Sequence, residues 1–369
     1  MMFLFSLILS GTSASIISAS DTRYVRGLGR SFPAGGGLGV SWLGGGLKVS
    51  HNGTVLRATS RAHSRGFKWV TYESTQGNDP WQGVAIIPGS ALNESFTASA
   101  GGSGETKILI NSPPDYWADG ADAAVLLTLE SDGSFLPAPP APTRVLHVLG
   151  DSITAATNVR GGFPRCADMG LYADLSSSWA GILCAFFGAS CSTVAVGGKG
   201  LVKNCCDTGG PTVPDFYTQT KKNDPTGSFN FSDAPPDGVL VYLGTNDYSH
   251  GGSPALDLAF TAGFLQFMKN VTQRFYGTPA APLNTTFFAI LGPMSPSLPS
   301  RALQAAVSQG TALGFRVVFV NATTACGDDL GGCTDGCAGH PGVASHRNIA
   351  RMVAPLVEKF LGWPVPGVL

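Results

Sequence analysis

The amino-acid sequence predicts two domains, a β-sandwich followed by a three-layer α/β/α domain with a parallel sheet. In residues 21–135, short runs of apolar residues are broken by glycine, a pattern typical of sandwich strands. The stretch LPAPPAPT at 136–143 excludes helix and central strand, so we expect a stiff linker there. In residues 144–369, continuous apolar runs alternate with helical stretches, which indicates a parallel sheet covered by helices on both faces.

The expected sandwich strands lie in short segments bounded by turn residues. The clearest are GVSWLGGGLKVSHNGTVLRATS, FKWVTYES, GVAIIP, TKILIN and AAVLLTLES. The 49 glycines and 25 prolines of the chain agree with many turns and much β structure.

The expected parallel strands of the second domain are five apolar runs. In chain order they are RVLHVLG, CSTVAVG, GVLVYLG, TTFFAILG and FRVVFVNA. Between them lie helix-like stretches such as SSWAGILCAFFG and AFTAGFLQFMKNVTQRF. Strand and helix thus alternate as a parallel sheet requires.

The N-terminal residues 1–20, MMFLFSLILSGTSASIISAS, combine a short apolar run with small residues and are interpreted as a signal peptide. The alternative is a buried N-terminal strand. The run is too short for a comfortable transmembrane helix, and no later stretch is long enough to span a bilayer. We therefore expect a secreted protein that does not bind membranes.

Glycosylation sequons and cysteines also favour secretion. Six N-x-S/T sequons are present, at Asn52, Asn93, Asn230, Asn270, Asn284 and Asn321. The eight cysteines are Cys166, Cys184, Cys191, Cys205, Cys206, Cys326, Cys333 and Cys337. In an oxidising compartment they are expected to form disulfides, whose connectivity the sequence does not determine.

The charge composition excludes one class of partner. The net charge is −1 and only 13% of the residues are charged, with no basic block that could neutralise phosphates, so we expect no nucleic-acid partner. The cysteines and histidines lack zinc-site spacing, so we expect no metal or other cofactor. We also expect a monomer.

Polar motifs follow the predicted parallel strands. GDS follows the first strand, GGKG the second and GTND the third, and CTDGCAGHPGVASH comes after the fifth. Ligands of parallel α/β sheets bind beyond the carboxyl ends of the strands, so these motifs are expected to meet at one rim.

This convergence makes Ser152 a candidate nucleophile and His340 its candidate base, because a serine hydroxyl attacks only when a base takes its proton. Simpler roles remain open for each residue. Ser152 could be a helix N-cap, and His340 a surface histidine. Asn246 and Gly198 could be turn residues.

Two other histidines are expected to be structural. His147 lies inside the first parallel strand, and His346 lies along the closing helix.

The ordered set Ser152 in GDSIT, Gly198 in VGGKG, Asn246 in GTND and His340 in GHP resembles the GDSL/SGNH hydrolase superfamily. The preceding glycine-rich sandwich, GGKGL and HPGVASH are most similar to carbohydrate esterase family 2. The resemblance implies a jelly-roll domain and a flavodoxin-like SGNH domain that removes acetyl groups from polysaccharides. It also implies an oxyanion hole formed by the backbone N–H groups of Ser152 and Gly198 and the side-chain amide of Asn246.

The resemblance fails at the acidic member of the catalytic set. The family aspartate lies three, or in family 2 two, residues before the histidine, where this chain has Cys337 and Ala338. Either Asp335 reaches His340 through a bend of the loop, or a backbone carbonyl orients the ring in a serine–histidine dyad.

Three functions are therefore considered. The leading one is a secreted serine esterase that deacetylates a glycan without a cofactor. The alternatives are an esterase or lipase acting on lipids or small esters, and a glycan-binding protein whose hydrolase domain has decayed. The sequence determines neither the polysaccharide nor the acetylated hydroxyl.

Overall fold

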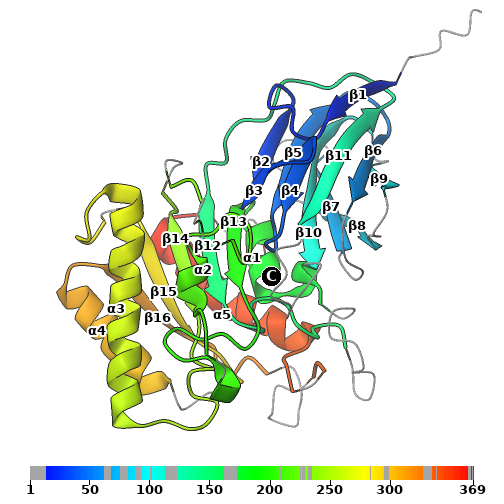
Figure 1. Cartoon of the computed structure of the whole chain (residues 1–369). Coiled ribbons are helices and arrows are strands. Elements are labelled where there is room, and N and C mark those ends of the chain that lie inside the picture. The colour runs from blue at the N-terminus through cyan, green and yellow to red at the C-terminus, as the bar shows by residue number, and fades with distance from the viewer. Residues whose placement is uncertain are drawn as a thin grey trace, which may run out of the picture.

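The structure is a computed structural model of the chain, in which a β-sandwich and an α/β domain lie side by side (Figure 1). The residues that it describes are 14–61, 68–74, 82–88, 93–99, 102–112, 123–161, 173–207, 209–224, 226, 229–231, 235–282, 284–294, 299–326, 335–337, 339–364, 367 and 369.

The first domain is built from two antiparallel sheets. One has the order β3 (Ser31–Ala34), β4 (Gly37–Val40), β11 (Ala124–Ser131), β6 (Leu56–Arg61) and β9 (Glu94–Ser99), with β1 (Ser15–Ser18) also paired to β11. The other has the order β2 (Val25–Leu28), β5 (Gly46–His51), β10 (Gly104–Ser112), β7 (Lys68–Ser74) and β8 (Gln82–Pro88).

Apolar side chains of both sheets form one core, including Val40, Leu47, Trp69, Ile108 and Leu126. The two antiparallel sheets match the predicted sandwich, and the jelly-roll connectivity stays a prediction.

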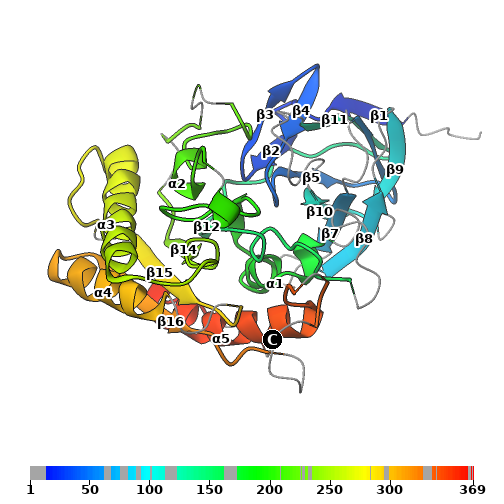
Figure 2. The ribbon, with the colours of Figure 1, turned by 60° about the horizontal axis from the view of Figure 1, so that its bottom comes forward.

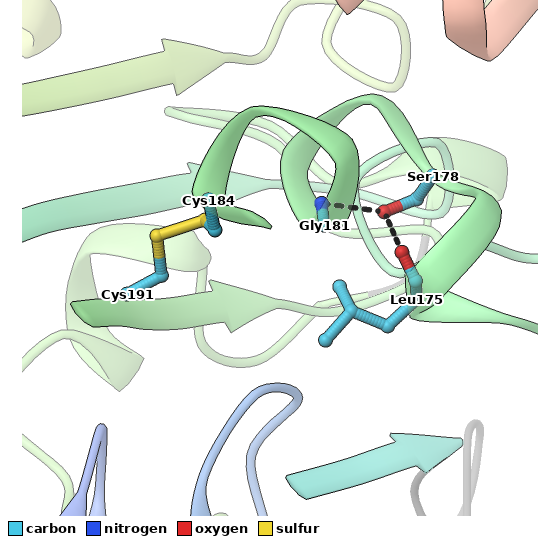
Figure 3. Close-up of a disulfide and its surroundings, with 5 residues drawn as sticks. All are labelled: Leu175, Ser178, Gly181, Cys184 and Cys191. Atoms are coloured by element: carbon cyan, nitrogen blue, oxygen red, sulfur yellow. Dashed lines mark hydrogen bonds between the residues drawn. A yellow bond between two sulfur atoms is a disulfide. The ribbon is translucent and has the colours of Figure 1, made fainter. Parts of the chain in front are cut away.

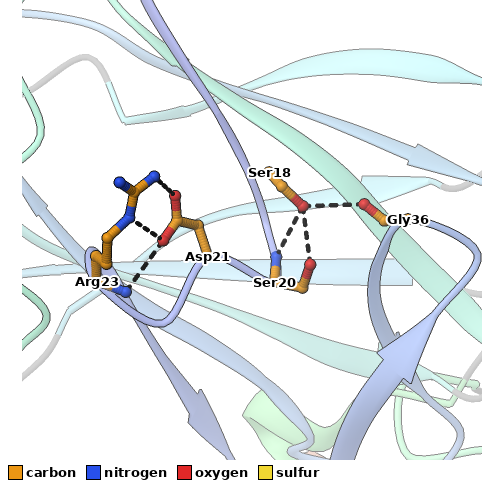
Figure 4. A network of polar contacts seen from close by, with 5 residues as sticks. All are labelled: Ser18, Ser20, Asp21, Arg23 and Gly36. Atoms are coloured by element: carbon orange, nitrogen blue, oxygen red, sulfur yellow. Dashed lines mark hydrogen bonds and ion pairs between the residues drawn. The ribbon is translucent and has the colours of Figure 1, made fainter.

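The start of the sandwich differs from the predicted boundary at residue 20. β1 pairs with β11, and Ala19 is fully buried. The Ser18 hydroxyl donates to the Gly36 carbonyl at 2.9 Å, and Asp21 forms an ion pair with Arg23 at 2.7 Å (Figure 4). Residues 15–20 are therefore part of the sandwich in this structure, as in the alternative of an N-terminal strand. The apolar run of the predicted signal peptide, within residues 1–13, lies outside the described residues.

The second domain contains the predicted parallel sheet, with all five predicted strands. Its order is β13 (Ser190–Ala195), β12 (Val145–Gly150), β14 (Gly238–Tyr242), β15 (Thr286–Leu291) and β16 (Arg316–Asn321). Numbered along the chain this is 2-1-3-4-5, the flavodoxin-like order, in which the connection reverses beside the first strand. Figure 2 shows the sheet with helices on both sides.

Helices cover both faces of this sheet and complete the predicted three layers. α1 (Trp179–Phe186) and α5 (Val343–Leu361) pack on one face, and α2 (Val213–Phe216), α3 (Pro254–Tyr276) and α4 (Ser300–Ala312) belong to the other side. α3 begins where the Ser253 hydroxyl accepts a hydrogen bond from the Leu256 N–H, and it ends at Gly277 in the left-handed conformation. Within the described part of the chain, no helix has the length and apolarity needed to cross a bilayer.

The cysteines are in two redox states. Cys184 and Cys191 form a disulfide that joins α1 to β13 (Figure 3). Cys326 and Cys337 each take part in a disulfide as well. Cys205 and Cys206, by contrast, carry thiol groups, so the expectation that all the cysteines form disulfides is not met at this pair. Cys166 and Cys333 lie outside the described residues.

The two domains share buried contacts. The Arg30 side chain, 1% exposed, donates to the Ser192 hydroxyl at 3.0 Å and to the Gln219 carbonyl at 2.6 Å. Trp42 of the sandwich belongs to the core formed by α3 and the parallel sheet, and its indole N–H also donates to Gln219. The sandwich is therefore packed into the second domain.

The two histidines expected to be structural are both buried. His147 contacts the Tyr217 hydroxyl through Nδ1 at 2.7 Å, and burial lowers its pKa to about 3. His346 accepts a hydrogen bond from the Trp179 N–H through Nδ1 at 3.1 Å. Burial lowers the pKa of His346 to about 4, the facing charge of Asp335 opposes this shift, and His340 adds to it. Both structural assignments are confirmed.

The burial of neutral His346 makes stability depend on pH. Its folded-state pKa lies below the unfolded value, so the unfolded chain binds the extra proton as the pH falls from about 6.5 to 4, and stability falls with it. His346→Asn keeps an acceptor for Trp179 and does not titrate. We expect wild type to lose roughly 2–3 kcal/mol more unfolding free energy than H346N between pH 7 and 4.5 in urea titrations. Equal losses in the two proteins would contradict this account.

Candidate active site

Three of the predicted site residues follow three adjacent strands of the parallel sheet. Ser152 follows β12, Gly198 follows β13 and Asn246 follows β14, and β12 lies between the other two. Because the strands are parallel, their carboxyl ends share one rim at the reversal of strand order, where such sheets bind ligands. The structure thus brings these three motifs together.

Ser152 lies in a turn that follows β12 directly. The Asp151 carboxylate accepts a hydrogen bond from the Ile153 N–H at 3.0 Å, so the cap of this turn is Asp151. No helix begins at Ser152 within the described residues 151–161, which removes the N-cap role considered from the sequence. A Cβ atom at Gly150 would lie 1.9 Å from the Thr154 hydroxyl, so only glycine fits before the turn.

Asn246 connects the first two motifs through its side-chain amide. Its Nδ2 donates to the Lys199 carbonyl at 2.8 Å and to the Asp151 carboxylate at 3.3 Å. Asp151 is fully buried, and burial, with a further contribution from the nearby Asp247 charge, raises its pKa to about 7. Asn246 is therefore held beside the Ser152 turn and the Gly198 turn at once.

The segment after Gly198 is organised by a residue that sequence analysis gave no role. The Asp247 carboxylate accepts hydrogen bonds from the N–H groups of Leu201, Val202 and Lys203 at 2.8–3.0 Å. Gly198 has a φ of 72°, a left-handed conformation that favours glycine. Burial raises the pKa of Asp247, and the three donors oppose that shift.

His340 lies in a short loop before α5. Its N–H donates to the Cys337 carbonyl at 3.1 Å, and its own carbonyl accepts from the Gly336 N–H at 3.1 Å. The Asp335 carboxylate accepts from the Gly342 N–H at 2.7 Å and from the Ser345 hydroxyl at 2.6 Å. Asp335 therefore fastens this loop to the first turn of α5.

Asn158 joins the loop of His340 to the turn of Ser152. Its side-chain Nδ2 donates to the Cys337 carbonyl at 3.2 Å, and its backbone carbonyl accepts from the Cys337 N–H at 3.3 Å. Asn158 is fully buried and has a φ of 58°, which asparagine tolerates better than most residues. The two candidate catalytic segments, 188 positions apart in sequence between Ser152 and His340, are thus connected by two reciprocal hydrogen bonds.

Sequence analysis missed Asp151, Asn158 and Asp247. Asp151 and Asp247 are inside the quoted motifs GDS and GTND, so their adjacency to Ser152 and Asn246 was a usable signal. No feature of the sequence marks Asn158, because its role depends on a contact with a distant loop.

A cavity of about 340 Å³ lies between the sandwich and α1, with Lys48, Lys107, Leu175 and Cys191 among its lining residues. It also reaches Ser190, at the amino end of β13, and so lies away from the rim of Ser152. Across the described residues, no group of three or more His, Cys, Asp or Glu side chains is placed to hold a metal ion.

Comparison with known proteins bears on the fold and on the family that the chain resembles. No protein-family model matches the chain. A cellulase/esterase from Acetivibrio thermocellus is 27% identical over 241 residues, which are 63% of this chain and 27% of that protein. The chain therefore spans only about a quarter of the length of this curated relative.

Two solved structures are similar over nearly the whole chain. A carbohydrate esterase family 2 enzyme with a carbohydrate-binding domain, from Corynascus thermopiles (Myceliophthora fergusii), is 28% identical with a TM-score of 0.73, covering 92% of this chain and 100% of that one. A family two carbohydrate esterase from Clostridium thermocellum in complex with cellohexaose is 20% identical with a TM-score of 0.75, with the same coverage. The resemblance to carbohydrate esterase family 2 that the motifs indicated is confirmed.

Proposed function

We propose that this chain is a serine esterase that removes acetyl groups from a glycan. The observation that carries the proposal is that the turns of Ser152, Gly198 and Asn246 meet at adjacent strand ends. The His340 loop is hydrogen-bonded to the turn of Ser152 through Asn158. The resemblance to carbohydrate esterase family 2 supports an ester hydrolase acting on carbohydrate.

In the proposed reaction the Ser152 Oγ attacks the ester carbonyl while His340 takes its proton. The tetrahedral oxyanion accepts hydrogen bonds from the N–H groups of Ser152 and Gly198 and from the Asn246 amide, which gives up its longer contact with Asp151, at 3.3 Å, to do so. His340 then gives its proton to the sugar oxygen as the bond between that oxygen and the acyl carbon breaks, which leaves an acyl group on Ser152. Water, deprotonated by His340, releases acetate and restores the serine.

Asp335 acts in this proposal through the position of the His340 loop. Its carboxylate accepts hydrogen bonds from the N-terminus of α5, and these contacts fix the direction in which the loop enters the helix. This is the serine–histidine dyad alternative, with Asp335 as a positioning residue.

The low exposure of Ser152 favours a small acyl group over the long chains of lipids. Ser152 is 5% exposed, and Asp151, Ile153 and Thr154 around it are fully buried. Each methylene that finds no room in such a site typically changes transition-state binding by 1–3 kcal/mol. The observation therefore supports the glycan acetyl esterase over the lipase alternative.

An acyl-chain series tests this preference. We expect kcat/KM for p-nitrophenyl acetate to exceed that for the octanoate ester by at least about tenfold, because the longer chain lacks room beside Ser152. The same preparation should release acetate from acetylated xylan or glucomannan. Faster turnover of octanoate would favour the lipase alternative. Binding of both polysaccharides, with no ester of either kind cleaved, would favour a glycan-binding protein.

Secretion is part of the proposal. The asparagines of all six sequons are exposed, at positions 52, 93, 230, 270, 284 and 321, where an added glycan would meet solvent. Together with the disulfides, this supports an extracellular site of action.

A further inference from the structure

The adjacent cysteines Cys205 and Cys206 differ from the other described cysteines. Cys184, Cys191, Cys326 and Cys337 are disulfide-bonded, whereas this pair carries thiols within a 3₁₀ turn (η2, Cys205–Asp207). A chain with several disulfides is suited to an oxidising environment, in which neighbouring thiols do not remain reduced indefinitely.

The two thiols are close together and accessible. Their side chains are hydrogen-bonded to each other, Cys205 is half-buried and Cys206 is exposed. Cys206 has a φ of 59° and a ψ of 26°, a left-handed conformation that costs roughly 1 kcal/mol or more for a residue other than glycine. The reduced pair is therefore held in a strained turn with one sulfur facing solvent.

The pair is also attached to the candidate oxyanion turn. The Cys205 N–H donates to the Gly198 carbonyl at 2.9 Å. The backbone carbonyl of Lys199, the next residue, accepts a hydrogen bond from the Asn246 side-chain amide. The charges of Lys199 and Asp151 both act on the Cys205 thiol, which places it beside the network of Ser152. A change in the backbone of Cys205 will thus be transmitted to Gly198.

We propose that Cys205 and Cys206 are an oxidation site for low-molecular-weight disulfides, and that the vicinal disulfide they form alters the turn of Gly198. The exposed Cys206 thiolate attacks one sulfur of the oxidant and expels one thiol. The Cys205 sulfur, after losing its proton, then displaces the second thiol and closes the ring. Two protein thiols are oxidised to one disulfide, and one disulfide is reduced to two thiols.

This disulfide differs from the structural ones in its ease of reduction. The Cα atoms of adjacent residues are about 3.8 Å apart across a trans peptide, below the usual disulfide range of about 4.4–6.8 Å. Cys184 and Cys191, at 6.1 Å, lie inside that range. Strained disulfides are more readily reduced, so mild reductant will open the vicinal ring and leave Cys184–Cys191 intact.

The chemical part of the proposal is tested by mass, without any activity. The folded protein is treated with glutathione disulfide, and then maleimide labelling and intact mass are measured. We expect the treated wild type to be two mass units lighter with neither thiol labelled, and Cys205→Ser, which lacks the sulfur that closes the ring, to accumulate a mixed disulfide with glutathione at Cys206. Peptide mapping assigns the bond. A wild type that keeps both thiols reactive, or that stops at a mixed disulfide, would overturn the proposal.

The effect on the turn is tested by hydrogen exchange of the amides in residues 198–204. We expect these exchange rates to differ at least severalfold between the reduced wild type and the wild type with the vicinal disulfide. Mild reductant should restore the rates of the reduced protein. In Cys206→Ser, which cannot form this disulfide, the rates should not change with redox treatment. Unchanged exchange in the ring form would overturn the link to Gly198.

The regulatory meaning of this site rests on the proposed esterase function. We expect kcat for p-nitrophenyl acetate to follow the same reversible change in wild type and to be insensitive to redox treatment in Cys206→Ser. A reduced protein that cleaves no ester would refute only the proposed esterase function. Intact mass and hydrogen exchange would still show whether the vicinal disulfide forms and whether it alters the turn of Gly198.

Discussion

Ser152→Ala should abolish acetate release from acetylated xylan and lower kcat/KM for p-nitrophenyl acetate on the order of 10⁴-fold or more, because the acyl-enzyme cannot form without the hydroxyl. The substitution removes one oxygen from a turn whose cap is Asp151, so the fold should be unaffected. Activity is measured by acetate release and by the chromogenic ester, and folding by circular dichroism and urea unfolding.

Ser308→Ala, at an exposed position on α4, is the matched control and should retain wild-type activity. If Ser152→Ala keeps more than a tenth of the wild-type rate, another nucleophile is responsible. If wild type and variant are folded and equally inactive on every ester tested, the glycan-binding alternative gains support.

Asp247→Ala is expected to have the largest effect on stability. Three backbone N–H groups lose their acceptor, that of Leu201 in a buried contact and those of Val202 and Lys203 in part-buried contacts. An unsatisfied donor typically costs about 1–3 kcal/mol when it is buried. We expect a loss of about 3 kcal/mol or more in unfolding free energy, measured by urea titration. Because the released segment directly follows the turn of Gly198, kcat should also fall on the order of 10²-fold.

Two control variants separate the lost acceptor from the lost charge. Asp247→Asn keeps one acceptor oxygen and should be intermediate in stability. Asp215→Ala removes the acidic partner of an exposed capping box and should cost only about 1 kcal/mol. An Asp247→Ala protein as stable as Asp215→Ala would mean that the three hydrogen bonds do not hold the turn.

The architecture of the second domain could be predicted because its signals are local and periodic. Most of the strands from β12 to β16 are nearly continuous apolar runs, since both faces of a parallel sheet are covered, and β13, with the sequence SCSTVA, is the exception. The rule that ligands bind at the carboxyl ends of strands then placed Ser152, Gly198 and Asn246 together. Their chemical roles remain predictions that the proposed variants test.

The features that escaped prediction depend on contacts between distant segments. Asn158 and Cys337 are hydrogen-bonded although 179 positions separate them in sequence, and the residues around either one do not predict this contact. The N-terminal strand β1 was ambiguous for a different reason, because a short run of apolar and small residues is equally suited to a signal peptide and to a strand. The redox state of Cys205 and Cys206 cannot be deduced from cysteine counts either.

The burial of Trp42 in the core of the second domain means that the sandwich and the second domain cannot be separated without exposing apolar surface. β13 is an edge strand of the parallel sheet, and Arg30 and Trp42 of the sandwich lie against the elements beside it. An uncovered edge strand invites pairing with other chains and aggregation. The sandwich therefore covers this edge strand and keeps it from pairing with other chains. A fragment beginning at the linker would expose the apolar surface that Trp42 covers in the intact protein.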